Sequence, residues 1–191
     1  MANANVPFGL KPVRGAFSQP YNDGAQPYAA AASDSVAIRY GDPVTVTGAA
    51  TADGVPYVAL TTAGGTTNSI TGVAVGFRPV GATEWLGYRP ASVEYEVLVE
   101  DNPLAEFFIQ EDSVGGAVAV ASVGLNAQLV YGTATGNNSA AMLDSSTAAT
   151  TATHQLRILG LAQIVNNAQG NYAIWRVRLN MHTHIPATAG V

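Results

Sequence analysis

Polar and apolar residues alternate most clearly between residues 94 and 112, where the sequence reads EYEVLVEDNPLAEFFIQED. Alternate positions divide into an apolar face and an acidic face, made by Val93, Tyr95, Val97 and Val99 against Glu94, Glu96 and Glu100. A period of two is typical of a half-buried strand. Residues 101–103 supply turn chemistry, and a second apolar run begins at residue 107. The pattern predicts a strand, a turn and a strand.

Six further segments have strand patterns, at residues 35–40, 42–47, 57–62, 70–77, 156–164 and 172–182. The last alternates strictly, which predicts an inward face of Trp175, Val177, Leu179 and Met181 and an outward face of Arg176, Arg178, Asn180 and His182. Residues 114–131 predict two short buried strands, with a helix as the alternative. Strands at a spacing of roughly ten residues favour a single-domain all-β fold, either a β-sandwich or a barrel.

The first 34 residues are rich in proline and glycine, which predicts an extended N-terminal arm ahead of a β domain at residues 35–191. The arm nevertheless has scattered apolar side chains, among them Phe8, Leu10, Phe17 and Tyr21. These residues are expected to lie either on the chain's own sheet or on a neighbouring molecule. Within the β domain, residues 132–153 predict a long loop rich in Ser, Thr and Ala.

Charged residues are sparse, at 11% of the chain, and the formal net charge is −5. The eight basic residues form no run that would neutralise successive phosphates, so nucleic acid is not an expected partner. No apolar run is long enough to span a bilayer, so no membrane partner is expected either. The first residues lack the pattern of a signal peptide. The absence of cysteine excludes disulfides and thiolate chemistry.

Two groups of residues are candidates for chemistry. Glu94 and Glu96 share one face of a strand, with Cα atoms roughly 6.5 to 7 Å apart, a separation compatible with a glycosidase pair. Such spacing arises on any strand with two exposed acids, and acids on an edge strand also discourage unwanted sheet pairing. His182 and His184 could face one metal ion, but a third ligand is not evident. We therefore predict a non-enzyme without catalytic, cofactor-binding or metal-binding residues.

The loop that follows residue 79 contains Trp85, Tyr88 and Arg89. Aromatic residues beside arginine are typical of contact surfaces, although a loop aromatic can also fold back onto the core. We predict partner contacts at Phe8, Leu10, Phe17, Tyr21, Trp85, Tyr88, Arg89, Glu94 and Glu96.

Several segments together resemble the small head structural proteins of tailed bacteriophages, known as capsid decoration or cement proteins. They are MANANVPFGLKPV at the start, GDPV at 41–44, ITGVAVGF at 70–77, EDNPLAEFFIQED at 100–112, VGLNAQL at 123–129, LDSSTAATTATHQLRILGL at 143–161 and WRVRLNMHTH at 175–184. The resemblance spans nearly the whole chain. It includes no motif of functional residues that could be assigned one by one.

The resemblance implies a jelly-roll-like subunit on the outer surface of a mature icosahedral capsid, assembled in the cytoplasm of a bacterial host. There it would bridge neighbouring major capsid proteins and meet other copies of itself, as a homo-trimer or homo-dimer. One alternative is a carbohydrate-binding or hydrolytic β-sandwich, with Trp85 and Tyr88 as a sugar platform and Glu94 and Glu96 as acids. A tail or receptor-binding component is another.

Overall fold

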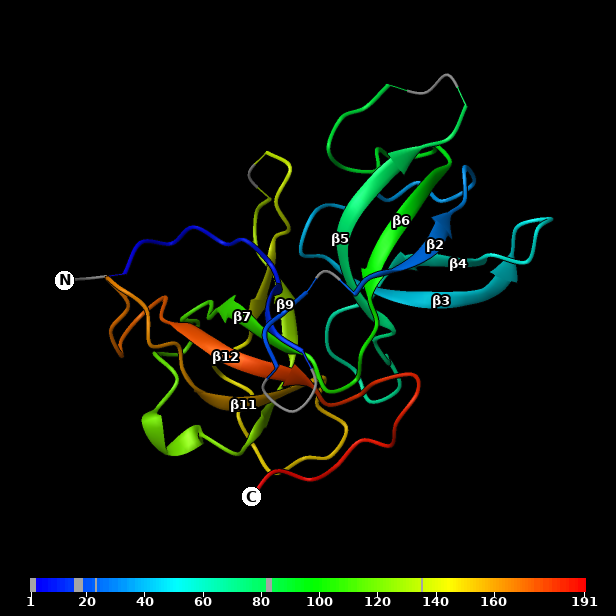
Figure 1. Ribbon diagram of the computed structural model, residues 1–191. Coiled ribbons are helices and arrows are strands. Elements are labelled where there is room, and N and C mark those ends of the chain that lie inside the picture. Colours follow the sequence, from blue (N-terminus) through cyan, green and yellow to red (C-terminus); the bar gives the residue numbers. More distant parts are fainter. Residues whose placement is uncertain (1–2, 16–18, 23, 82–83, 135) are drawn as a thin grey trace.

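The segment with the clearest alternation forms two strands, β6 (Tyr95–Glu100) and β7 (Glu106–Gln110), which belong to two different sheets. This arrangement comes from a computed structural model that describes residues 3–15, 19–22, 24–81, 84–134 and 136–191. The fold is all-β, as predicted, and its sheets pack into a single β-sandwich-like domain (Figure 1). The other elements are β1 (Lys11–Arg14), β2 (Gln26–Ala30), β3 (Pro43–Ala50), β4 (Pro56–Leu60), β5 (Gly72–Pro79), a 3-10 helix (Val120–Ser122), β8 (Asn126–Ala127), β9 (Leu129–Tyr131), β10 (Ala141–Leu143), β11 (Leu156–Leu161) and β12 (Ile174–Leu179).

A closed five-stranded barrel contains β6, in the order β2-β4-β3-β5-β6. Strands β2 and β4 pair in parallel, and the other neighbours pair antiparallel. The apolar face predicted for β6 is confirmed, because Tyr95, Val97 and Val99 are buried inside the barrel. Strand β6 has β5 on one side and β2 on the other, so the predicted edge strand is wrong. A closed barrel leaves no edge for acids to protect.

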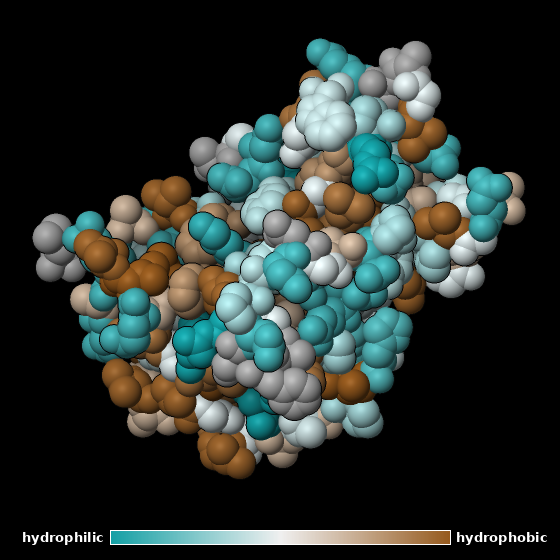
Figure 2. All heavy atoms as spheres, viewed as in Figure 1, coloured by the Kyte–Doolittle hydropathy of each residue, from teal (hydrophilic) through white to brown (hydrophobic). Residues whose placement is uncertain are grey.

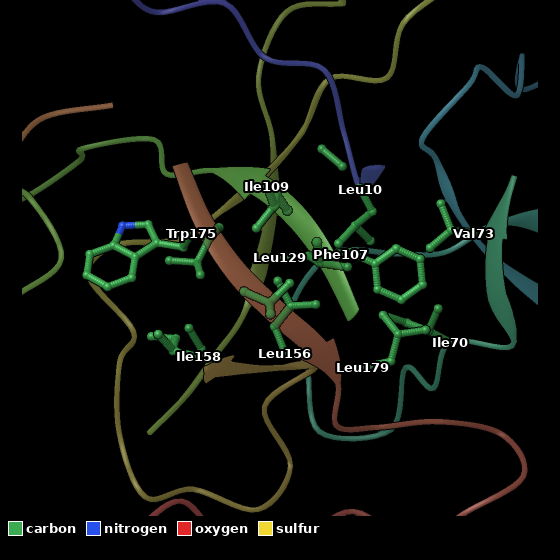
Figure 3. Packing of buried hydrophobic residues seen from close by; sticks show 14 of the residues in the cluster. Leu10, Ile70, Val73, Phe107, Ile109, Leu129, Leu156, Ile158, Trp175 and Leu179 are labelled. Carbon is green, nitrogen blue, oxygen red and sulfur yellow. The ribbon is translucent and has the colours of Figure 1, made fainter. Parts of the chain in front are cut away.

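The second sheet contains β7, in the antiparallel order β1-β7-β12-β11-β8. Its inner face packs on the two-stranded sheet of β9 and β10. Figure 3 shows the resulting core, in which Phe107 and Ile109 from β7 lie near Trp175 and Leu179 from β12. All four side chains are buried. The alternation of β12 predicted this for Trp175 and Leu179, whereas the apolar run at residues 107–109 was expected to be core throughout, and its Phe108 is only half-buried on the outer face.

The N-terminal segment, expected as an extended arm over residues 1–34, contributes two strands to the body of the molecule. Strand β1 pairs with β7, and β2 closes the barrel. Position 9, just before β1, requires glycine, because its φ is a positive 74° and a Cβ there would lie 2.4 Å from the Cβ of Ser139. The next residue, Leu10, is buried in the chain's own core.

Two further sequence expectations are corrected. Asn180 and His182 follow the end of β12 and are buried rather than facing outward. Residues 132–153 were expected as a long loop, but they include β10, whose Ala141 and Leu143 are buried against β9 and the core. Residues 114–131 contain two short strands, as predicted, which are β8 and β9, and they also contain the 3-10 helix.

A buried carboxylate ties β7 to β12. The Nε1 of Trp175 and the backbone N of Val118 each donate to Oε2 of Glu111 at 2.9 Å. Burial raises the pKa of Glu111, and these donors act against the rise. Glu111, one of the acids in the segment 94–112, is therefore part of the interior.

We expect Trp175→Phe to lower the free energy of unfolding by about 2–4 kcal/mol, because it removes a hydrogen bond to a buried carboxylate and leaves a small cavity. Urea denaturation measures the change. Trp85→Phe is the matched control, since Trp85 is 67% exposed and its substitution should alter stability by less than about 0.5 kcal/mol. Equal effects of the two substitutions would contradict the packing described for Trp175.

Candidate contact surface

The guanidinium of Arg89 is buried and holds two segments of the barrel together. Its Nε donates to the carbonyl of Val93 at 2.8 Å, and one Nη donates to the carbonyl of Asp34 at 2.8 Å. Further donors reach the carbonyls of Val36 and Ala31. An ion pair of 3.5 Å joins Arg89 to the carboxylate of Asp34. The prediction of Arg89 as a partner contact is therefore wrong, because its side chain is fully engaged within the subunit.

Exposed apolar side chains lie on the loop that contains Arg89 and on the segment 31–36, to whose carbonyls Arg89 donates. Trp85 is 67% exposed and Val36 is 46% exposed. The loop between β5 and β6, which includes Trp85, reaches beyond the end of the barrel (Figure 1). Tyr88 is half-buried, and the guanidinium carbon of Arg39 lies 5.7 Å from the centre of its ring. The predicted contact loop thus offers Trp85 to a partner more freely than Tyr88.

Glu94 and Glu96 line a groove on the barrel with a volume of ≈ 250 Å³. Both side chains are half-buried. Glu96 forms an ion pair of 3.1 Å with Arg78, and Glu94 accepts a long hydrogen bond of 3.5 Å from the hydroxyl of Tyr57. The residues that line this groove are Pro27, Tyr28, Ala29, Thr51, Asp53, Val55, Val80, Glu94, Tyr95 and Glu96. Trp85 and Tyr88 do not line it, so the structure does not join the aromatic and acidic parts of the sugar-site alternative.

Glu100, expected on a solvated or partner-facing row with Glu94 and Glu96, is buried at the end of β6. Burial raises its pKa, while the backbone N of Asn102 donates to its carboxylate at 3.2 Å. The next residue, Asp101, accepts a hydrogen bond of 2.9 Å from the hydroxyl of Tyr28. Both acids hold the turn after β6 by hydrogen bonds, with Glu100 buried and Asp101 half-buried.

The predicted contacts in the N-terminal segment have different surroundings. Leu10 is buried in the core and cannot reach a partner. Phe8 is half-buried and lines a hollow with Lys11 and Phe108. Tyr21 is half-buried beside Glu100. Phe17 lies outside the described residues.

The two histidines lie close together, with ring centres 5.3 Å apart. The backbone N of His184 donates to Nδ1 of His182 at 3.1 Å. Burial, followed by the neighbouring His184, lowers the pKa of His182. Within the part of the chain that the structure describes, no group of three His, Asp or Glu side chains could hold a metal ion.

A surface that the sequence did not reveal is the outer face of the five-stranded sheet. The outward positions of Arg176 and Arg178 follow from the alternation of β12, and the structure confirms them. Their cross-strand neighbours depend on strand order and register, which no local pattern fixes. The register places Arg176 beside Phe108, and Arg178 beside Glu106 and Arg157.

Comparison with known proteins found no matching family model, no matching curated protein and no matching solved structure. Among the described residues, no helix has the length and apolar character needed to cross a membrane.

We expect Arg89→Met to lower the free energy of unfolding by about 3–5 kcal/mol, because it leaves buried carbonyls without donors and Asp34 without its ion pair. Arg39→Met is the control, because the half-buried side chain of Arg39 makes only weak contacts: a long hydrogen bond of 3.3 Å to the carbonyl of Gly136 and a position 5.7 Å from the ring centre of Tyr88. It should cost about 1 kcal/mol or less. Chemical denaturation of both variants tests the assignment, and similar losses would show that Arg89 is not a clamp.

Proposed function

We propose that this chain is a non-enzymatic structural protein of a virion. In this proposal it decorates the outer surface of a tailed-phage icosahedral capsid, bridges neighbouring major capsid proteins and so stabilises the shell. The observation that carries the proposal is the exposure of Trp85 and Val36 on segments whose backbone carbonyls accept side-chain hydrogen bonds. Arg89 donates to the carbonyl of Val36. On either side of Trp85, the hydroxyl of Tyr95 donates to the carbonyl of Glu84, and Nδ2 of Asn137 donates to the carbonyl of Leu86 at 3.0 Å.

The physical argument concerns the cost of binding. A loop that is already ordered loses little conformational freedom when it meets a partner, so more of the interaction energy appears as affinity. Large aromatic side chains are the commonest strong contributors to protein interfaces. Trp85 combines both properties.

The resemblance of seven segments to phage head structural proteins supports the identity of the partner. A protein that covers a shell meets the same partner at many symmetric positions, so modest affinity at each contact is multiplied by the array. The chain's sparse charge, at 11%, also suits a surface that is largely covered by neighbours.

We expect Trp85→Ala to raise the dissociation constant for shells about 30-fold, which corresponds to the loss of a typical interface hot spot. The measurement is occupancy on shells of the encoding phage that lack this protein, titrated with purified chain. Hydrogen exchange of residues 84–93 should also slow on binding.

Val120→Ala is the control, because Val120 is 60% exposed on the 3-10 helix, outside the loop that contains Trp85. It should bind as the unaltered protein does. If Trp85→Ala binds shells with full affinity, the loop that contains Trp85 is not part of the contact. Failure of the unaltered protein to bind shells at all would refute the proposed function.

A further inference from the structure

The outer face of the five-stranded sheet gathers most of the positive charge of this acidic protein. Directly paired residues of adjacent strands project from the same face. One row across the sheet joins Lys11, Phe108 and Arg176, and the next joins Arg14, Glu106, Arg178 and Arg157. This basic sheet face therefore contains five of the eight Lys and Arg residues of the chain.

Four of the five cations of the basic sheet face have no acidic partner within the described part of the chain. Arg176 alone approaches an acid, Glu106, at 3.5 Å. Arg157 donates to neutral groups, among them Oδ1 of Asn126 at 3.0 Å. Among the described residues, no ion-pair partner is present for the side chains of Lys11, Arg14, Arg157 and Arg178.

Apolar side chains lie between these cations, in two hollows that share Phe108. One hollow, of ≈ 350 Å³, is lined by Phe8, Lys11, Tyr40, Phe108, Asn138, Ile164 and Ile174. The other, of ≈ 400 Å³, is lined by Val13, Arg14, Phe108, Leu161, Ala162, Gln163 and Arg176. Figure 2 shows hydrophobic and strongly hydrophilic residues side by side over the region where Figure 1 places β12. Arginine among apolar side chains is the composition of a protein interface.

The complementary charge lies on the other half of the same molecule. Residues 19–101, which contain all the barrel strands, include nine acids and three arginines, a formal charge of −6. The rest of the chain has five cations and four acids, a formal charge of +1, and the two parts together give the net charge of −5. The barrel groove combines the acids Asp53, Glu94 and Glu96 with apolar Val55 and Val80. Arg78 pairs with Glu96 at 3.1 Å, so Asp53 and Glu94 are the groove acids without an ion pair among the described residues.

We propose that the basic sheet face binds the acidic barrel groove of a second copy of this chain. The two surfaces differ, so the contact is head-to-tail, and repeated contacts close into a ring or continue as a row. Charge complementarity fixes the orientation, because sheet face against sheet face and groove against groove would each oppose like charges. The inference deepens the proposed function and rests on it only for the setting, in which a shell brings copies together.

The test is a pair of charge reversals in the free protein, Arg178→Glu on the sheet face and Glu94→Lys in the groove. Sedimentation velocity over a range of concentrations, up to about 1 mM, measures association of the unaltered chain and of each variant. Each single variant should raise the dissociation constant about tenfold or more, because each places like charges across the contact. An equimolar mixture of the two variants should restore association, since the reversed face of one then meets the reversed groove of the other.

Two controls have the same changes in net charge at a site away from both surfaces. Thr66→Glu with Thr67→Glu matches Arg178→Glu, and Thr66→Lys with Thr67→Lys matches Glu94→Lys, because both threonines are exposed in the loop before β5. Thermal unfolding of every variant verifies that each is folded. Raising the salt from about 0.15 M to about 1 M should weaken association of the unaltered chain, because the Debye length falls from about 8 Å to about 3 Å.

A monomeric unaltered chain at every concentration would overturn the inference, as would a mixture that fails to associate. If Arg178→Glu loses shell binding but self-associates normally, the sheet face binds the shell and the inference is wrong. Shell binding without self-association would refute this inference alone. Self-association without shell binding would refute the proposed function alone.

Discussion

Two consecutive strands must fill two different cores, and the rest of the structure depends on this constraint. Strand β6 turns Tyr95, Val97 and Val99 into the barrel, and β7 turns Phe107 and Ile109 into the core of the second sheet. A simple hairpin would have placed both apolar faces in one core. The turn between β6 and β7, residues 101–105, therefore connects the barrel to the five-stranded sheet.

Side-chain hydrogen bonds stabilise the turn between β6 and β7. The carboxylate of Asp101 accepts from the hydroxyl of Tyr28, and the side-chain oxygen of Asn102 accepts from the backbone N of Leu104 at 2.9 Å. Gly72 lets the start of β5 lie close to the end of β6, because a Cβ at position 72 would lie 2.4 Å from the carbonyl oxygen of Glu100. Glu100 and Asp101 therefore make their hydrogen bonds within the chain. Because Glu100 is buried, fewer of the acids at residues 94–112 lie on the barrel surface than the sequence indicated.

The interior and the surface divide the few charged residues in different ways. Inside, Arg89 and Glu111 satisfy backbone and indole groups that would otherwise be buried without partners. Outside, five of the eight cations lie on one face of the five-stranded sheet, whereas nine of the thirteen acids fall within residues 19–101, which contain the barrel strands. The net charge of −5 does not reveal this uneven distribution.

The sequence by itself determined the all-β class and the buried faces of β6 and β12, because a period of two is set by the strand backbone whatever lies around it. The apolar run of β7 predicted a strand but did not distinguish the buried Phe107 and Ile109 from the outward Phe108. Only the tertiary structure decided which strands pair, and therefore that β6 is enclosed, that Arg89 is an internal clamp and that cations from three strands share one face. Pairing joins residues far apart in the chain, such as Lys11 and Phe108, and a local pattern cannot specify it. The same reason explains Glu100 and His182, whose alternation indicated solvent but whose burial comes from segments distant in sequence.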